Sequence, residues 1–588
     1  MSATAPRQGA LTELKRLLPY VRRYAKLVWL GLLFITLSNV CSTTIPRVVG
    51  AAIDALKTNV IDDTSMLLLV GQILGLTIGS GFFMWATRRT IIVMSRYVEE
   101  DLRNDFTAAL QRQSQRFFHE RSTGQILAHF TSDIGSVREF IGPAIMYSAN
   151  TITTFAFALS WMLSINVPLT ASIVLPVPLL AWATYRLGRM IHERYKVVQE
   201  QYEQITTQAQ ETFSGVRVVR AYVREEQESQ RFDALSDTYY RKNIRLARVN
   251  GLMMPSMTVL FNITYLVVIG FGGVLVMRNS LSVGDLTQFF IYLNQLLWPI
   301  AAIGWVTGMI QRGAASMGRL GTFIDAVPDI ADGESTDTSI SKLKGSVRFN
   351  GVSLRHGQTT VLNEITIDVP AGTSLGIVGH VGSGKSSMAS LLSRLYDVSE
   401  GSITIDGHDV RNIPLHVLRG AIAMVPQEAF LFSDTIRNNV RFGRPEASDA
   451  DVEQAAHVAQ LDADIANLQN GYETVVGERG VTLSGGQKQR TALARAILSN
   501  PAVLILDDSL SAVDTDTEER ILRGLSSVMQ HRTTIMIAHR ISTVQHCDTI
   551  IVLHEGKIIE RGSHAELLAL GGQYADMYER QLLMEELA

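Results

Sequence analysis

The sequence predicts an α-helical six-span transmembrane domain followed by an α/β P-loop nucleotide-binding domain. Three observations support this fold class. Five long windows in the first half lack any formal charge, and near residue 345 short β-branched runs begin to alternate with helical patterns. An apolar run at residues 374–378 then leads directly into a Gly-x4-Gly-Lys-Ser pattern. A chain of 588 residues is also too long for one hydrophobic core, so at least two domains are expected.

The uncharged windows are long enough to cross a bilayer as helices, because a span needs about 20 apolar residues. Four windows fit one span each. The longest fits two, with a tight turn at residues 164–168 between them. Soluble helices rarely lack charge over such lengths. The windows are residues 27–46, 64–87, 140–185, 249–277 and 286–311.

Basic residues predict the orientation of the spans. Five lysines and arginines lie between positions 15 and 26, and the long connections at residues 88–138 and 186–248 are also basic. The short loops after spans one, three and five carry only Arg47, Lys57 and Arg278. The positive-inside rule places both termini and the long connections in the cytoplasm. We therefore expect a multi-pass integral protein of the bacterial inner (cell) membrane, whose intracellular helices continue beyond the bilayer and return.

Composition sets the domain limits and excludes some functions. Residues 1–326 are expected to form the transmembrane domain, with an N-terminal cytoplasmic helix and two long intracellular loops. Residues 327–343 are expected to form a linker, and residues 344–588 the nucleotide-binding domain. The net charge of −3 gives no sign of a nucleic-acid partner. The only two cysteines, Cys41 and Cys547, do not indicate a disulfide framework.

The Gly-x4-Gly-Lys-Ser pattern, known as Walker A, is typical of a phosphate-binding loop. Glycines let the backbone approach a phosphate closely, and the helix that follows adds its positive dipole end. Lys385 is expected to reach the β- and γ-phosphates, Ser386 to coordinate Mg²⁺, and Ser387 to help hold the phosphates. The candidate ATP contacts in this loop are Gly379, Gly382, Ser383, Gly384, Lys385, Ser386 and Ser387.

Two later segments complete the nucleotide chemistry. A second apolar strand at residues 503–506 ends on Asp507, a candidate Mg²⁺ ligand. Ser484, Gly485 and Gly486, followed by Gln487, precede a helical run. A serine and glycines at a helix N-terminus form an anion site.

Together these motifs resemble those of ATP-binding cassette exporter half-transporters, and the likeness covers essentially the whole chain. In that family two cassettes meet head to tail, and each ATP lies between one subunit's phosphate loop and the other's signature segment, here Ser484, Gly485, Gly486 and Gln487. The resemblance implies ATP and Mg²⁺ as cofactors and ATP hydrolysis coupled to transport. It also implies three partners: a second half-transporter, the lipid bilayer and a small amphipathic substrate.

Other residues match the family one by one. Gln427 resembles the glutamine that senses Mg²⁺ and faces the membrane domain, and His539 resembles the switch histidine that contacts the γ-phosphate. Asp514 lies in a segment that resembles the loop coupling the two ATP sites. Glu478 lies in one that resembles the exporter segment touching the partner's cytoplasmic loops. Residues 123–133 and 211–232 resemble the two intracellular loops that press on the cassettes.

The chain departs from the family pattern at two positions. Asp508 stands where the family has the glutamate that polarises the attacking water, and aspartate is one methylene shorter. A misplacement on the order of 1 Å can cost about 10²-fold in rate, so Asp508 should support slow hydrolysis at best. That Asp508 compensates by a small shift is the alternative. His356 stands where the family usually has a tyrosine that stacks on adenine, and imidazole offers less area.

A weak catalytic base beside an intact signature resembles the degenerate-site subunit of heterodimeric multidrug exporters. The alternatives are a homodimer with two slow sites, which would be active without a partner, and a regulatory subunit that binds ATP without transport. Import of a metal chelate through exporter architecture is a further alternative. The polar residues expected either to line the cavity or to pack between helices are Asn39, Asn150, Asn262, Asn294 and Gln295.

Overall fold

The computed structural model describes residues 10–57, 62–174, 177–530 and 532–587. The chain divides into two compact units. The first comprises Met1–Ala108 and Gly124–Asp325, and the second comprises Ala109–Thr123 and Ala326–Ala588.

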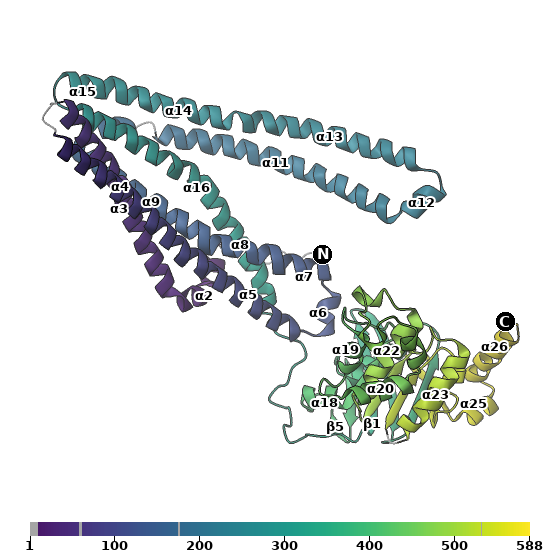
Figure 1. Cartoon of the computed structure of the whole chain (residues 1–588). Helices are drawn as coiled ribbons and strands as arrows, with labels where there is room; N and C mark the ends of the chain where they lie inside the picture. The colour runs from purple at the N-terminus through teal and green to yellow at the C-terminus, as the bar shows by residue number, and fades with distance from the viewer. Residues whose placement is uncertain (1–9, 58–61, 175–176, 531, 588) are drawn as a thin grey trace. The chain divides into compact units, whose positions relative to one another are not determined.

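The first unit is helical throughout its described residues (Figure 1). Four short segments of its described residues are π-helical. Three of them, η1, η3 and η4, lie within the spans or their extensions, and the fourth, η2, ends at Asp133. The elements are α1 (Ala10–Lys15), α2 (Leu18–Arg23), α3 (Ala25–Lys57), α4 (Asp63–Thr87), η1 (Arg88–Ile92), α5 (Val93–Gln111), α7 (Thr123–Ala128), η2 (His129–Asp133), α8 (Ile134–Glu139), η3 (Phe140–Ala144), α9 (Ile145–Ile165), α10 (Val167–Val174), α11 (Val177–Ser214), α12 (Val216–Ala221), α13 (Glu225–Gly251), α14 (Met253–Val267), η4 (Val268–Gly272), α15 (Gly273–Met277) and α16 (Val283–Ile324).

Several of these helices are apolar and long enough to cross a membrane. Within the described part of the chain four meet that criterion: Ala25–Lys57, Asp63–Gln111, Glu225–Met277 and Val283–Ile324. They cover the first, second, fifth and sixth expected spans. The 21-residue α9 covers the third. The fourth expected span crosses residues 175–176, which lie outside the described residues.

The predicted turn between spans three and four is present. Helix α9 ends at Ile165 because Asn166 adopts an extended backbone with φ −157°. The Asn166 side chain then accepts a hydrogen bond from the backbone N–H of Leu169 at 2.9 Å, which begins α10. An asparagine that bonds to a nearby backbone group is a common way to separate two helices.

Helices α11 and α13 lie side by side as a long hairpin, with the short α12 at its tip (Figure 1). Polar side chains join the pair: Thr212 donates to Glu228 at 3.0 Å, and Lys242 donates to Gln201 at 2.9 Å. The sequence predicted helices between spans four and five that continue beyond the bilayer and return.

Two of the polar residues in the spans pack between helices. Asn39, which is buried, donates from Nδ2 to Oδ1 of Asn150 at 3.1 Å and so joins α3 to α9. Gln295 donates to the backbone carbonyl of Ser42 at 3.0 Å and joins α16 to α3. For Asn39 and Gln295 these contacts favour the packing alternative, because an amide needs such partners where water is absent.

The second unit holds two sheets. The strands are β1 (Val347–His356), β2 (Thr359–Val369), β3 (Ser374–Gly379), β4 (Glu400–Ile405), β5 (His408–Asp409), β6 (Ile422–Val425), β7 (Val503–Asp507), β8 (Thr533–Ile537), β9 (Thr549–His554) and β10 (Lys557–Gly562). The smaller sheet, in the order β2-β1-β4-β5, is antiparallel. The larger has the order β10-β9-β3-β8-β7-β6 and is parallel except for β10. The larger sheet is therefore mostly parallel, which agrees with the predicted α/β class of this domain.

Helices α17 to α26 belong to this unit, as does α6 (Gln115–His119) from the first long connection. The others are α17 (Lys385–Leu392), α18 (Leu415–Ala421), α19 (Ile436–Arg441), α20 (Asp449–Val458), α21 (Asp462–Ala466), α22 (Gly485–Leu498), α23 (Thr515–Met529), α24 (Ile541–Val544), α25 (His564–Leu570) and α26 (Gln573–Leu587), with short 3₁₀ turns η5 (Gly471–Glu473) and η6 (Glu478–Gly480). Strands β3, β7 and β8 are buried at every position, as expected of a parallel sheet with covered faces.

One part of the first long connection, Ala109–Thr123, packs within the second unit, whereas the expectation that residues 123–133 press on the nucleotide-binding domain stays a prediction. Gln113 donates there to the carbonyl of Ala326 at 3.0 Å, and Ser114 donates to Asp329 at 3.3 Å. Residues 124–133 belong to the first unit.

Asp406 holds the chain where it enters β1. Its carboxylate accepts hydrogen bonds from the backbone N–H groups of Lys344, Gly345 and Ser346, and its own φ is +52°. We expect Asp406→Ala to lower the free energy of unfolding of the second unit by about 2–3 kcal/mol, because several backbone donors lose their acceptor. Asp406→Asn should cost less, since asparagine keeps one acceptor oxygen and tolerates positive φ. Differential scanning calorimetry of the full chain measures this.

Lys344→Ala is the matched control, because it removes an exposed side chain and keeps the backbone N–H. Equal shifts for Lys344→Ala and Asp406→Ala would contradict this role for the carboxylate.

Candidate functional site

The phosphate loop follows the fully buried strand β3 and precedes α17. Gly379 has φ +150°, and a Cβ there would lie 2.2 Å from the carbonyl oxygen of Leu553. Gly384 has φ +100°, and its Cβ would lie 2.9 Å from the carbonyl oxygen of Val361. Glycine is therefore required at both positions by backbone contacts of the fold itself.

Lys385 and Ser383 supply polar groups inside this loop. The Lys385 ammonium, 6% exposed as a residue, donates to the carbonyls of Gly379 at 2.8 Å and His380 at 2.9 Å. Burial lowers the pKa of Lys385, while the charges of Asp508 and Asp507 oppose the shift. The buried Ser383 hydroxyl has no hydrogen-bond partner in the described structure. A buried ammonium and an unpaired hydroxyl suit a phosphate group, which supplies acceptor oxygens.

Ser386 and Asp507 meet although they are far apart in sequence. The Ser386 hydroxyl donates to Oδ1 of Asp507 at 3.0 Å. Burial raises the pKa of Asp507, which is 4% exposed. A hydroxyl and one carboxylate fit Mg²⁺, which usually binds through one or two protein oxygens together with phosphate oxygens and water.

Asp508 lies beside Asp507 in a constrained backbone. Its φ is +47°, and its N–H donates to the carbonyl of Ile537 at 2.8 Å. Its carbonyl accepts a hydrogen bond from the Ser511 hydroxyl at 2.9 Å. Gln427 approaches the Asp508 carboxylate, with 3.4 Å between Nε2 and Oδ2. Asp508 is thus anchored on both sides, and its side chain faces Gln427.

His539 follows β8 by two residues and is half-buried. Strand β8 pairs in parallel with β7, the strand that ends on Asp507. The carbonyl of His539 accepts a hydrogen bond from Nε2 of Gln581 at 2.6 Å. The structure therefore brings Lys385, Asp507 and His539 to one edge of the parallel sheet.

The signature segment begins helix α22. Ser484 is the N-cap: its hydroxyl accepts from the backbone N–H of Gln487 at 3.3 Å, and Gln487 Oε1 accepts from the backbone N–H of Ser484 at 2.9 Å. Nε2 of Gln487 also donates to Asp464 at 3.2 Å. Gln487 thus completes a capping box. Ser484 and Gly485 remain exposed, while Gly486 is half-buried.

The two candidate coupling residues lie at the starts of short elements. Asp514 is the N-cap of α23 and accepts a hydrogen bond from the backbone N–H of Thr517 at 2.9 Å, which holds the pKa of Asp514 below its usual range. Glu478 is exposed and begins η6. No hydrogen bond between described residues joins Glu478 or Ser484 to the phosphate loop of the same chain.

His356, the candidate adenine contact, ends β1 and is exposed. Its ring lies edge-on to Tyr396, with centroids 5.3 Å apart and planes at 71°. A cavity of about 730 Å³ beside these rings is also lined by Arg116 and His119 of the first long connection. His356 therefore has an aromatic neighbour at an open pocket large enough for a purine.

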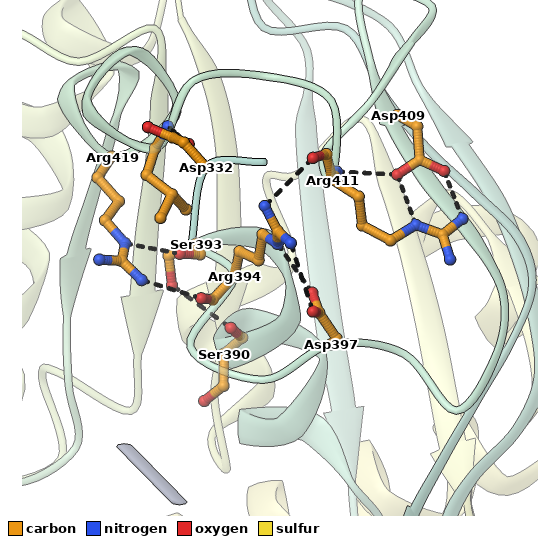
Figure 2. Close-up of polar contacts among 9 residues, drawn as sticks. Asp332, Ser390, Ser393, Arg394, Asp397, Asp409, Arg411 and Arg419 are labelled. Carbon is orange, nitrogen blue, oxygen red and sulfur yellow. Dashed lines mark hydrogen bonds and ion pairs between the residues drawn. The ribbon is translucent and has the colours of Figure 1, made fainter. Parts of the chain in front are cut away.

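The segment that carries Tyr396 is held by arginines at the far end of α17 (Figure 2). Arg394, with φ +50°, donates from Nε to Asp397 at 2.9 Å and from Nη1 to the carbonyl of Arg411 at 3.3 Å. Arg419 donates to the carbonyl of Arg394 at 3.1 Å. Cationic groups at a helix C-terminus are stabilising, so this cluster fixes the helix that the phosphate loop begins.

Comparisons with known proteins agree with this architecture. A family model described as "ABC transporter transmembrane region" matches residues 28–300, and one described as "ABC transporter" matches residues 362–511. The chain is 36% identical to the "Probable multidrug resistance ABC transporter ATP-binding/permease protein YheI" of Bacillus subtilis (strain 168), over 97% of this chain and 98% of that protein. The chain belongs to the ABC transporter family.

Two further comparisons agree with membership of the ABC transporter family. The chain is 35% identical to the "ATP-dependent lipid A-core flippase" of Desulfotalea psychrophila, over 82% of this chain and 84% of that protein. A solved structure described as a bacterial Atm1-family ABC exporter with ATP bound matches with TM-score 0.79 and 30% identity, over 95% of this chain and 98% of that one. One transmembrane region joined to one ATP-binding domain is the architecture of an exporter half-transporter. Such proteins are membrane translocases that act as dimers.

The sequence did not reveal three residues whose contacts position this transporter's site. Gln489, buried on α22, donates to the Ser511 hydroxyl at 3.5 Å and accepts from the backbone N–H of Ala512 at 3.1 Å. It thereby joins the signature helix to the segment containing Asp514. The other two residues are Glu518 and Gln581. A lone glutamine or glutamate on a helix gives no sequence signal of such a role.

We expect Gly379→Ala to lower ATP affinity by at least about tenfold, because the new Cβ would displace the loop backbone from Leu553 and even a shift near 1 Å is costly. Gly372→Ala is the control: φ is +80° there, but nothing lies within 4 Å of the added Cβ. It should cost about 1–2 kcal/mol of stability and leave ATP affinity unchanged. Equilibrium binding of ATP to both purified variants tests this, and equal affinity losses would contradict it.

Proposed function

We propose that this chain is one half of a heterodimeric, ATP-driven exporter that moves amphipathic small molecules, drugs or lipids, across the membrane by alternating access. The chain supplies a weak ATP site around Asp508 and the signature segment that completes the partner's active site. The observation that carries this proposal is the anchored backbone of Asp508.

The Asp508 backbone opposes the shift that a short side chain would need. An aspartate carboxylate falls about 1.5 Å short of a glutamate carboxylate, the length of one carbon–carbon bond. Hydrogen bonds to Ile537 and from Ser511 hold the backbone on both sides of the residue. Moving the carboxylate forward would break at least one of them. The alternative in which Asp508 compensates by a small shift is therefore disfavoured. The ATP site that contains Asp508 hydrolyses ATP slowly.

The signature segment has no corresponding defect. The capping box of Ser484 and Gln487 is complete, and the serine and the first glycine are exposed. A capped helix N-terminus with open N–H groups suits the γ-phosphate of an ATP held by a second chain. A weak base and an intact signature in one chain support a division of labour, in which the partner supplies the catalytic glutamate.

Within its own ATP site we assign these roles. Lys385 and the loop from Gly379 to Ser387 hold the phosphates, Ser386, Asp507 and Gln427 hold Mg²⁺, and His539 contacts the γ-phosphate. His356 packs against adenine. Asp514 and Glu478 connect the two sites across the dimer. This site keeps ATP for longer than the partner's site does, and so holds the two cassettes together.

In the proposed cycle, ATP binding closes the cassettes, the intracellular loops pass this closure to the spans, and hydrolysis resets the transporter. The chain lies in the bacterial inner membrane with both termini in the cytoplasm. The relatives named as a multidrug resistance transporter and a lipid A-core flippase support an amphipathic cargo and export. Export and a heterodimer are favoured over chelate import and a homodimer.

We expect ATPase activity in lipid to appear only when the chain is co-expressed with a second half-transporter encoded beside it. It should disappear when the partner's catalytic glutamate is changed to glutamine. Rates of phosphate release from proteoliposomes that hold either chain alone, or both chains, measure this. Robust turnover by this chain alone would contradict the heterodimer and favour the homodimer.

Asp508→Glu tests the weak base directly. Restoring the methylene should raise the hydrolysis rate of this chain's own site by about 10- to 100-fold, because the carboxylate then reaches the attacking water. The rate is measured in the pair whose partner glutamate has been removed, so that only this site turns over. Asp508→Asn is the matched control and should give no rise. An unchanged rate in Asp508→Glu would show that Asp508 does not limit hydrolysis.

A further inference from the structure

The C-terminal helix α26 is firmly attached to the second unit at its start. The backbone N–H groups of Gln573 and Tyr574 donate to the carboxylate of Glu560 on β10, at 2.6 and 3.0 Å. The Tyr574 side chain is fully buried, and its hydroxyl lies 2.8 Å from Nδ1 of His564. A helix anchored in this way can hold a later side chain in a fixed position.

One such side chain is Gln581, two turns further along α26. Its Nε2 donates to the carbonyl of His539 at 2.6 Å, and its Oε1 accepts from the backbone N–H of Ile541 at 2.8 Å. A single amide group therefore binds the main chain on both sides of Arg540. His539 and Ile541 lie about 40 residues before Gln581 in the sequence.

We propose that Gln581 is a positioning residue that sets the main chain of the switch histidine, so that the His539 ring meets the γ-phosphate of ATP. This inference rests on the proposed role of His539. Gln581 itself does not touch the nucleotide. It acts through the backbone of the histidine.

Glu518, on helix α23, contacts the segment that follows His539. It is 3% exposed and accepts a hydrogen bond from Nη1 of Arg540 at 2.7 Å and another from the Thr543 hydroxyl. Glu518 lies on α23, which begins after Asp514. Glu518 thus holds the side chains that follow the histidine, whereas Gln581 holds the histidine's own carbonyl.

Loss of the Gln581 hydrogen bonds should weaken the binding of nucleoside triphosphate and leave the binding of diphosphate unchanged. Losing one hydrogen bond that orders a loop changes an equilibrium by about fivefold. Because His539 faces the γ-phosphate, a misplaced His539 should weaken triphosphate binding. Diphosphate binding, which depends on the phosphate loop, should not change. A role of Gln581 in stability alone would weaken binding of both nucleotides together.

The test compares Gln581→Met with wild type in the full chain in lipid nanodiscs. Methionine has a similar length and volume but cannot make either hydrogen bond. Glu579→Ala, on an exposed position of the same helix, is the matched control. Equilibrium binding of a slowly hydrolysed ATP analogue and of ADP is measured with Mg²⁺. We expect Gln581→Met to weaken analogue binding by roughly 3- to 10-fold and ADP binding by less than twofold. Both should be unchanged in Glu579→Ala.

Hydrogen exchange gives a structural readout of the same contact. The amide of Ile541, which bonds to Gln581, should exchange faster in Gln581→Met and not in Glu579→Ala. Unchanged exchange, or equal losses of ATP-analogue and ADP binding, would overturn the positioning role.

His539→Ala separates the two proposals. If His539→Ala weakens binding of the ATP analogue and Gln581→Met adds no further loss in that background, Gln581 acts through His539. If His539→Ala weakens analogue binding but Gln581→Met alone does not, the positioning role is wrong and the role of His539 stands. If His539→Ala leaves binding unchanged, the assigned role of His539 is wrong and the inference falls with it.

Discussion

The parallel register of strands β3, β8, β7 and β6 is the constraint on which the ATP site depends. Asp507 pairs with Ile537 across β7 and β8, and Ile377 pairs with the same residue from β3. Parallel strands in register end at one edge of the sheet, so the segments that follow them must meet there. Lys385, Asp507 and His539 converge for this reason, although more than 150 residues separate the first from the last.

Most contacts that position this edge act on the main chain. Ser511 bonds to the carbonyl of Asp508, Gln489 to the N–H of Ala512, and Gln581 to the main chain at His539. Side-chain anchors of this kind leave little freedom for a loop to move as a unit. In the proposed mechanism, a side chain that is one methylene short is then a lasting defect, because the backbone cannot follow. The consequence proposed for the aspartate at position 508 depends on this rigidity of the backbone.

The local motifs were predictable from sequence because each is a short run whose spacing is set by one strand, loop or helix start. The phosphate loop, the capped signature helix and the turn at Asn166 are of this kind. The contacts of Gln489, Glu518 and Gln581 were not predictable, because each joins a helix to a segment distant in sequence through a single polar residue.

The sequence by itself determined the membrane-spanning character of the first half, the nucleotide-binding pattern of the second, and the substitution of aspartate for glutamate at position 508. These follow from charge, hydropathy and spacing along a local stretch of chain. Only the tertiary structure decided that the Asp508 backbone is anchored and that the C-terminal helix holds the main chain at His539. Such features depend on which distant segments pack together, and pairing of that kind leaves no periodic trace in the sequence.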